Sequence, residues 1–439
     1  MIAIIGGGAS GVILAAHLLK VPGDRRIVLI EKGERIARGL AYSTTLLDHV
    51  LNVRAQNMSA LPDDPDHFLR WLVAKGLAAP DTPFYFAPRA TYGDYLNDLL
   101  DEAAAQSPGR LDILRDEAVA IEPLPSGDAR IELASGGSIE TGTAVLAIGH
   151  DLEPERSDRI TFRLNGAGDT PLDPDAPVLI LGTGLSMVDA LLMLEARGHR
   201  GHVTAVSRRG LLPQRHELPS PIPFAENDLP FGQPPSRFLS WLRSQVRKRV
   251  EAGGNWRDVV DGLRPFNQRI WQSWTDEQRR PFLRHGKAWW DTHRHRMAPE
   301  IYDRVCHAIE AGRLTVRAAK VQDMAREGDA TRVRIRPRGS DMVETLRVAR
   351  VYDCTGIIRN VEKTTNPLLR QLVDAGIARA DPLNLSLHVT QDCRLIGRDG
   401  QPSDSLFALG PLTRSRFFEI DAIPEIRVQC AALAARLMQ

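Results

Sequence analysis

The sequence predicts an α/β fold with two Rossmann-like nucleotide-binding units, of which the second carries a helical insertion. Two observations support this prediction. Residues 2–16 read as a short apolar strand, a glycine turn and an apolar helix start, and residues 178–193 repeat this order. The length of 439 residues exceeds one average domain, so we expect two domains with ample core.

The first turn fits the pattern G-x-G-x-x-G and contains Gly6, Gly8, Ser10 and Gly11. The first glycine permits a tight turn, the second lets N–H groups approach a pyrophosphate, and the third allows close helix packing. The next apolar run, Ile27–Ile30, ends in Glu31, where such folds place the carboxylate that accepts from an adenosine ribose hydroxyl. A signal or membrane segment is disfavoured, because no Lys or Arg precedes the run and glycines interrupt it.

The second turn retains Gly182 and Gly184, followed by Ser186, but has Met187 at the position of the third glycine. We therefore expect looser packing of this helix on its strand. The next strand, residues 202–207, does not end in an acid but continues into Ser207, Arg208 and Arg209. A carboxylate there would repel a 2′-phosphate, whereas a hydroxyl and guanidinium groups can bind it. These residues favour an NADPH site over a solvated basic turn.

Composition narrows the function classes. A net charge of +1 argues against broad binding of nucleic acid or anionic membranes. The four cysteines form no C-x-x-C pair, which disfavours a zinc site and a flavin-linked disulfide relay; they are Cys306, Cys354, Cys393 and Cys430. No targeting segment is evident, and we expect a cytoplasmic protein with reduced thiols.

Residues 1–150 form the first part of the expected FAD-binding domain. We predict a helix at 67–73, a helix after Pro88 and a strand at 111–114. A hairpin-like pair, 129–133 with 144–148, follows and ends at Gly149. A linker rich in proline, aspartate and glycine, roughly 151–176, indicates a domain boundary.

Residues 177–350 form the expected NADPH-binding domain, with a helical insertion at about 211–299. Strands resume at 313–317, 331–336 and 346–356, and the last ends at Gly356. Residues 351–439 complete the FAD-binding domain. They contain a strand that ends at Gly410 and Pro411, and a helix that starts near Pro424.

Taken together, these motifs resemble the glutathione-reductase-like flavoproteins with two dinucleotide-binding domains. A closer resemblance is to the bacterial FAD-NAD(P)-binding branch, which includes a urate hydroxylase and is related to class B flavin monooxygenases. The shared motifs are Leu51-Asn52-Val53 with Met58-Ser59, Pro88-Arg89 with Tyr92-Gly93 and Tyr95, and 410–414 with Glu419. The resemblance implies FAD and NADPH as cofactors. The sequence lacks an evident F-x-G-x-x-x-H signature, which disfavours ketone oxygenation.

The favoured hypothesis is an NADPH-dependent monooxygenase that hydroxylates a small polar or heterocyclic molecule through a flavin C4a-(hydro)peroxide. Two alternatives stay open: a flavin reductase or dehydrogenase that passes electrons to another acceptor, and a non-catalytic flavin sensor. The candidate catalytic residues are Asn52, Arg54, Arg89 and Glu419, with Phe417 and Phe418 on the substrate side. We expect Asn52 to lie on the flavin side.

The expected partners are a small-molecule substrate and O₂, without nucleic acid or membrane. The helical insertion is expected to act as a cap over the nicotinamide cleft or as the surface of a homodimer. Its His293 and His295 are two residues apart and so do not share a helix face, which disfavours metal ligation.

Overall fold

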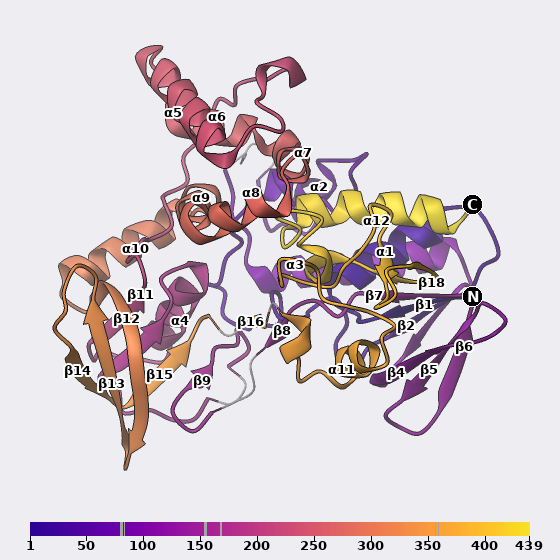
Figure 1. Cartoon of the computed structure of the whole chain (residues 1–439), viewed down its shortest axis with the longest axis horizontal. Helices are drawn as coiled ribbons and strands as arrows, with labels where there is room; N and C mark the ends of the chain where they lie inside the picture. Colours follow the sequence, from indigo (N-terminus) through magenta and orange to yellow (C-terminus); the bar gives the residue numbers. More distant parts are fainter. Residues whose placement is uncertain (80–81, 83, 153–155, 167–168, 356, 359) are drawn as a thin grey trace. The chain divides into compact units, whose positions relative to one another are not determined.

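The structure, a computed structural model, describes residues 1–439 except 80–81, 83, 153–155, 167–168, 356 and 359. The chain divides into two compact units, whose elements are labelled in Figure 1. The first comprises Met1–Thr45, Arg54–Glu153 and Ile357–Gln439, and the second comprises Leu46–Val53 and Pro154–Gly356. Within the part of the chain that is described, no helix is both long and apolar enough to cross a membrane.

A six-stranded sheet forms the core of the first unit, in the order β17-β18-β7-β1-β2-β3. All neighbours are parallel except β17 and β18. Every residue of β1 and β2 is buried, as expected for strands that are covered on both faces. The strands are β1 (Ile2–Ile5), β2 (Ile27–Ile30), β3 (Leu111–Leu114), β7 (Thr143–Leu146), β17 (Arg394–Ile396) and β18 (Pro402–Ala408).

Helices cover this sheet, and α1 packs against both α3 and α12. Figure 1 shows α1 and α12 alongside the strands. The predicted helices at 67–73, after Pro88 and near Pro424 are confirmed. The helices of the first unit are α1 (Ala9–Lys20), α2 (His67–Ala74), α3 (Arg89–Gln106), α11 (Pro367–Asp374) and α12 (Ile423–Leu437), with 3₁₀ turns at Ala55–Asn57, Val361–Lys363 and Gly410–Thr413.

The predicted hairpin between 129–133 and 144–148 is wrong. β5 (Ala129–Leu133) instead pairs antiparallel with β4 (Ala118–Pro123) and β6 (Ser138–Thr141), whereas β7 pairs in parallel with β1 and β18. The burial patterns explain the choice. β5 alternates between buried and half-buried residues, as on a sheet with one wet face, while β7 has three consecutive buried residues and needs cover on both faces.

The second unit is built on a seven-stranded sheet in the order β14-β13-β12-β11-β10-β15-β9. The strands from β12 to β9 are parallel, and β12, β13 and β14 form an antiparallel extension. The strands are β9 (Ile160–Thr161), β10 (Val178–Leu181), β11 (Val203–Ser207), β12 (Leu314–Glu327), β13 (Ala330–Pro337), β14 (Glu344–Val348) and β15 (Arg350–Asp353).

The single strand predicted at 346–356 is two strands. β14 pairs with β13, and β15 pairs with β10 on the other side of the parallel strands. Ala349, between them, donates its N–H to the carbonyl of Pro177. The chain therefore changes pairing partner at one residue, without a turn signal in the sequence. The predicted linker contains β9, and β8 (Asp151–Leu152) pairs with β16 (Ile357–Ile358) in the first unit.

The helical insertion is confirmed. A π-helical turn at Phe282–Gly286 joins two of its helices, and 3₁₀ turns occur at Glu226–Asp228 and Arg264–Phe266. The helices are α5 (Pro235–Glu251), α6 (Trp256–Gly262), α7 (Asn267–Gln272), α8 (Asp276–Pro281), α9 (Lys287–Arg294) and α10 (Pro299–Glu310), preceded in the chain by α4 (Leu185–Ala196).

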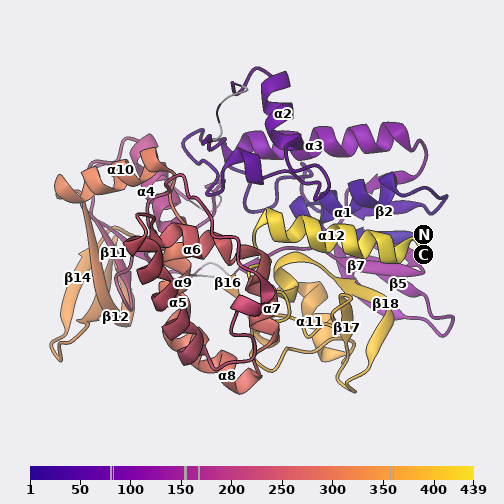
Figure 2. The same ribbon diagram turned by 90° about the horizontal axis from the view of Figure 1, so that it is seen from above.

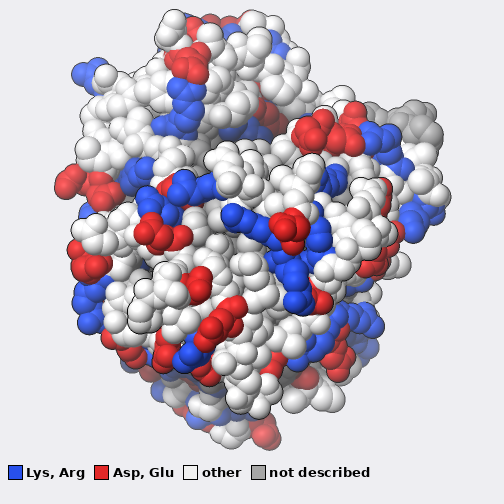
Figure 3. Space-filling model, turned by 90° about the vertical axis from the view of Figure 1, so that its right-hand side faces the viewer, with Lys and Arg blue, Asp and Glu red and all other residues white. Residues whose placement is uncertain are grey.

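Charged side chains of both signs are interspersed on the molecular face drawn in Figure 3. This distribution agrees with a net charge of +1 in a chain in which a quarter of the residues are charged.

Candidate functional site

The first glycine turn has a geometry that two of its residues can adopt only as glycine. Gly6 has φ +106°, and a Cβ there would lie 2.6 Å from the carbonyl oxygen of Ala147 on the neighbouring strand end. A Cβ on Gly11 would lie 1.9 Å from the carbonyl oxygen of Gly6. The first glycine thus permits the turn and the third permits close contact between α1 and the turn, as the sequence predicted.

The N-terminus of α1 is shaped to hold an anion. Gly8 precedes the helix in an extended conformation, and no side chain caps the helix start. The N–H groups of the first helical turn therefore point away from the helix at its N-terminus, where the helix dipole gives a partial positive charge. Gly39, with φ +46°, faces Gly8 closely: a Cβ on Gly39 would lie 3.6 Å from the Cα of Gly8. Ala37 donates its N–H to the carbonyl of Gly7 at 2.7 Å. The cradle is thus lined by backbone, which fits a pyrophosphate.

Glu31 lies at the end of β2, where the sequence predicts an acid. Its Oε2 accepts from the N–H of Gly7 at 2.6 Å, and its Oε1 accepts from the N–H of Gly33 at 2.6 Å. Each carboxylate oxygen retains a further lone pair. The side chain is thereby held in one orientation beside the glycine turn, and it can accept from ribose hydroxyls.

The C-terminal segment of the first unit returns to the same turn. Gly410 has φ +63°, and a Cβ there would lie 2.6 Å from Oγ of Ser10. Its N–H donates to Oε1 of Gln429 on α12 at 2.9 Å. Pro411 follows in a buried 3₁₀ turn. Ser10, Gly410 and Pro411, which are far apart in the sequence, therefore lie together at the N-terminus of α1.

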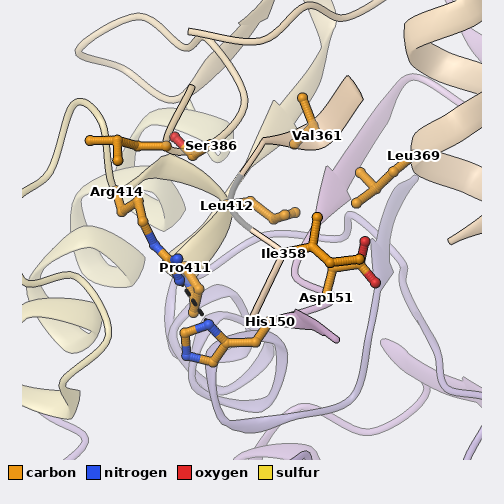
Figure 4. A pocket seen from close by; sticks show the side chains of 11 residues that line it. His150, Asp151, Ile358, Val361, Leu369, Ser386, Pro411, Leu412 and Arg414 are labelled. Carbon is orange, nitrogen blue, oxygen red and sulfur yellow. Dashed lines mark hydrogen bonds between the residues drawn. The ribbon is translucent and has the colours of Figure 1, made fainter. Parts of the chain in front are cut away.

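A small crevice beside this turn is lined by Gly149 and Pro411 and contains a polar group that the sequence did not predict (Figure 4). Nη2 of Arg414 donates to Nδ1 of His150 at 2.7 Å and to Oδ1 of Asp421 at 3.1 Å. Because a guanidinium can only donate, Nδ1 must be unprotonated and the His150 ring carries its hydrogen on Nε2. Nε2 lies 3.7 Å from Oδ1 of Asp421. His150 follows the small-residue end of β7, which was the one available sequence signal.

The other first-unit candidates lie in partly or fully buried positions. The Arg54 guanidinium lies 5.8 Å from the ring centroid of Phe84. Arg89 is the first residue of α3 and lies near the hydroxyl of the buried Tyr42. Glu419 is buried and has φ +62°, an uncommon conformation for a side-chain-bearing residue. Phe417 and Phe418, on the same loop, are buried as well.

The second glycine turn has the same backbone form as the first, but different side chains pack against it. Gly182 has φ +101°, and a Cβ there would lie 3.2 Å from the methyl group of Thr355. Gly184 precedes α4, again without a side-chain cap, and a Cβ on it would meet no atom within 4 Å. Met187 is fully buried in place of the third glycine. The carbonyl of Ser186 lies 3.3 Å from Sγ of Cys354.

The strand end after this turn uses hydroxyl groups instead of a carboxylate. Oγ of Ser207 accepts from the N–H of Gly210 and lies 2.9 Å from Oγ1 of Thr183, which donates to the carbonyl of Leu211. Ser207 therefore shapes the turn as well as ending the strand. Nη2 of Arg209 points to the carbonyls of Arg284 and His285 at 3.3 and 3.2 Å. Arg208 is the member of the pair that lines a cavity.

This cavity has a volume of about 680 Å³ and extends from Gly182 along the end of β11 and the middle of β12. Three further cations line it, namely Arg156, Arg159 and Lys320. Three carboxylates, those of Asp158, Asp323 and Asp353, line it as well. Nε of Arg156 pairs with Asp158 at 3.2 Å and Nε of Arg159 pairs with Oδ2 of Asp353 at 3.1 Å, while Oδ1 of Asp353 accepts from the N–H and the hydroxyl of Thr355. The cavity is thus large enough for a nucleotide-sized ligand, and the described residues that line it include one more cation than carboxylates. The three additional cations come from the predicted linker and from β12, and no motif marks them.

Asn52 belongs to the second unit, and its carbonyl accepts from Nε2 of His216 at 3.0 Å. The segment around it is anchored there too, since His49 is fully buried with Nε2 at 2.9 Å from the carbonyl of Asp189. Gly356 lies outside the described residues.

Comparisons with known proteins agree with this architecture. Residues 3–151 match the family described as FAD-NAD(P)-binding. No curated protein matches the chain. Among solved structures, the chain is similar to ornithine N-hydroxylase of Kutzneria sp. 744, described with reduced FAD, NADP⁺ and L-ornithine, at 15% identity and TM-score 0.66, covering 100% of this chain and 98% of that one.

Two further solved structures have the same overall fold. L-lysine 6-monooxygenase of Pseudomonas syringae has 18% identity and TM-score 0.62, with 100% and 98% of the two chains covered. Thioredoxin reductase of T. acidophilum has 11% identity and TM-score 0.51, with 100% and 98% covered. The chain therefore has the α/β fold of enzymes with paired Rossmann-like domains for FAD and NAD(P), and its first 151 residues contain the match to the FAD-NAD(P)-binding family.

Proposed function

We propose that this protein is an FAD-dependent monooxygenase that uses NADPH to hydroxylate a small polar molecule. One observation carries the proposal. The chain contains two glycine turns with uncapped helix N-termini. The side chains at the end of the strand beside each turn have opposite charges: the Glu31 carboxylate in the first unit and the Arg208 guanidinium in the second. Two nucleotides with different ribose substituents explain this pairing better than one.

The residues of the first unit fit FAD. Gly6, Gly8 and Gly11 would let the pyrophosphate approach the first turn of α1, and Glu31 would accept from the adenosine ribose. When bound, the flavin supplies the redox chemistry: it takes a hydride from NADPH and activates O₂. Gly149, Gly410 and Pro411 would provide backbone surface beside it, since all three line or border the crevice next to the turn.

The second unit would bind NADPH in the cavity beside Gly182 and Gly184. Arg208 would bind the 2′-phosphate, and Lys320 would add a second positive charge to the cavity, whereas Arg156 and Arg159 are paired with Asp158 and Asp353. Ser207 would act mainly by shaping this end of the cavity, because its hydroxyl is already engaged by Gly210 and Thr183. Arg209 would support the π-helical turn that its guanidinium contacts.

Arg54 and Arg89 would hold NADP⁺ or orient an anionic substrate, and Glu419 would lie on the substrate side. Asn52 stays a proposed functional residue of the second unit. Small amines are the first substrate class to test, because two proteins of the same fold are named as an ornithine N-hydroxylase and an L-lysine 6-monooxygenase. Heterocycles such as purines are the second class, since the sequence motifs resemble a branch that includes a urate hydroxylase.

Anaerobic mixing of the FAD-loaded protein with NADPH, followed by labelled O₂ and a panel of amines and heterocycles, tests the proposal. We expect the flavin absorbance to bleach with NADPH and one labelled oxygen atom to appear in a product, detected by mass spectrometry. Failure of NADPH to bleach the flavin would overturn the cofactor assignment. Bleaching together with turnover of a quinone or disulfide, without labelled product, would identify a reductase instead, a function compatible with the thioredoxin reductase fold.

A further inference from the structure

An aromatic cluster in the first unit brings together rings from three separate segments of the chain. We call Tyr42, Tyr92, Tyr95 and Trp71 the aromatic chain. Successive ring centroids are 4.9 Å apart between Tyr42 and Tyr92, 5.4 Å between Tyr92 and Tyr95, and 5.6 Å between Tyr95 and Trp71. Trp71 comes from α2 and the two central tyrosines come from α3, which lies beside α2 (Figure 2). The four rings therefore form an unbroken series of contacts.

Packing alone does not explain the hydroxyl groups in this cluster. Tyr92 is fully buried, and its hydroxyl has no hydrogen-bond partner among the residues that the structure describes. A buried hydroxyl without a partner costs about 1–3 kcal/mol relative to a paired one. Phenylalanine would fill the same space without that cost, as Phe68 does where it contacts the rings of Tyr92 and Tyr95. Tyrosine at this position thus suggests a role for the phenol other than stability.

Tyr95 has a base in hydrogen-bond contact. Its oxygen lies 2.8 Å from Nδ1 of His67 and accepts from the N–H of Ala60 at 3.1 Å. Since the Ala60 N–H can only donate, the phenolic hydrogen is available to Nδ1. Burial lowers the pKa of His67, which keeps the ring neutral and able to accept a proton near neutral pH. This geometry couples loss of an electron from Tyr95 to transfer of its proton.

The two ends of the aromatic chain, Trp71 and Tyr42, lie in different surroundings. At one end, Trp71 is partly exposed, and its indole N–H donates to Oδ2 of Asp98 at 3.0 Å. At the other end, the N–H of Tyr42 donates to the carbonyl of Arg38, in the segment that contacts the first glycine turn through Ala37. The series thus runs from the vicinity of the dinucleotide cradle toward solvent.

We propose that the aromatic chain donates electrons to one-electron oxidants, with Tyr95 and His67 as its proton-coupled site. In this step Tyr95 gives one electron through the neighbouring rings to the oxidant, its O–H bond breaks, and the proton forms an N–H bond at Nδ1 of His67. The products are a neutral tyrosyl radical, an imidazolium and the reduced oxidant. Return of one electron, with the proton from His67, restores the phenol.

In turnover, the oxidants would be oxygen radicals released when O₂ is reduced without substrate hydroxylation. That part of the inference rests on the proposed function, whereas electron transfer among the rings does not. A Tyr and Trp series would then direct oxidation away from the cofactor site and toward residues that can be reduced again.

Pulse radiolysis of the FAD-loaded protein tests electron transfer along the aromatic chain, without NADPH or substrate. Azide radical oxidises tryptophan side chains, and the indolyl and phenoxyl radicals have separate absorption bands. We expect phenoxyl absorbance to grow in as indolyl absorbance decays. The polypeptide contains seven tryptophans, and any of them can contribute to this kinetic phase of phenoxyl growth. Trp71→Phe is therefore needed to identify the part of the phase that starts at Trp71. Tyr95→Phe should abolish that part, and His67→Gln should slow it.

Tyr352→Phe is the matched control, because Tyr352 is a buried tyrosine of the second unit that bonds to Asp169. It should leave the Trp71-dependent phase unchanged. His67→Gln keeps the test decisive if Tyr95→Phe does not fold, because it removes the proton acceptor of Tyr95. Tyr92→Phe removes a hydroxyl without a partner on the far side of Tyr95 from Trp71, so it should leave the phase unchanged and the Tm equal or higher. A phase of equal size and rate in the wild-type protein, Tyr95→Phe and His67→Gln, or no phenoxyl growth in the wild type, would overturn the proposal. Neither result depends on whether NADPH reduces the flavin.

Discussion

The two glycine turns share one backbone design but differ in what surrounds them. Each follows a strand of four residues, each begins with a glycine at φ above +100°, and each leads into a helix whose N-terminus has no side-chain cap. In the first turn, Gly11 leaves no space for a Cβ, whereas in the second the fully buried Met187 takes the equivalent position. The first strand end carries Glu31, and the second carries Ser207 and Arg208.

This comparison separates two requirements that a glycine motif combines. The turn and the open helix N-terminus depend on the first two glycines in both units. The third glycine is needed only where helix and turn approach within backbone contact, so a larger side chain can replace it where the helix stands further away. Ligand discrimination belongs to the strand end, where charge changes sign between the units.

The largest expected effect is the loss of the first unit through Gly11→Ala. The new methyl group would lie 1.9 Å from the carbonyl oxygen of Gly6, so β1 and α1 could not both keep their places. We expect little folded protein, without bound FAD, as judged by flavin absorbance and thermal unfolding. Gly184→Ala is the control, because a Cβ there meets nothing within 4 Å; its stability should change by less than about 1 kcal/mol. A yellow, stable Gly11→Ala variant would contradict the packing argument.

Met187→Ala tests the opposite situation in the second unit. Because Met187 is fully buried, its truncation should leave a cavity and lower the free energy of unfolding by about 2–5 kcal/mol. Denaturant unfolding of the whole protein measures this change. The control is Met342→Ala, in the same unit, whose residue is 77% exposed and whose truncation should have almost no effect. Equal losses in the two variants would show that Met187 is not the residue that fills the space of the third glycine.

Local patterns were predictable from the sequence, and pairing between distant segments was not. Both strand-turn-helix units and the helical insertion follow from periodicity and glycine position, which are properties of neighbouring residues. The pairing of β5 was predicted incorrectly, because the sequence around Ala129–Leu133 does not specify which strand lies opposite. The separation of β14 from β15 occurs at Ala349 alone, where no glycine or proline marks the change.

The candidate site shows the same division. The glycines, Glu31 and Arg208 could be predicted as site residues because each lies at a fixed distance from a recognisable turn. His150 and Arg414 are 264 positions apart and meet only in the folded first unit. Lys320 reaches the second cavity because β12 lies next to β11, a neighbour relation that the sequence did not give. The contacts between such residues carry no sequence signal until the fold is known.

Arg208→Glu tests the proposed discrimination at the second strand end. Replacing a guanidinium by a carboxylate beside the 2′-phosphate should raise the KM for NADPH about tenfold or more, because a charge-assisted bond is lost and repulsion is added. Steady-state NADPH oxidation measures it, with NADH as the internal control, whose KM should change little. Arg209→Gln should have the smaller effect on NADPH, since Arg209 contacts the carbonyls of Arg284 and His285. The reverse ranking would assign the phosphate to Arg209.

The smallest expected difference is between variants at the two strand ends. Glu31→Gln places an amide NH₂ against one of the two N–H groups, of Gly7 and Gly33, that the carboxylate now accepts. The variant should lose about 1.5–3 kcal/mol of stability, the range for a hydrogen bond to a charged group, and Ser207→Ala should lose about 0.5–1.5 kcal/mol, the range for a neutral one. Glu34→Gln, at an exposed neighbouring position, controls for the change in net charge. Chemical unfolding of the three variants ranks them. A loss for Ser207→Ala equal to that for Glu31→Gln would mean that charge adds nothing to the role of Glu31 in the turn, and that the carboxylate is required there for its ligand alone.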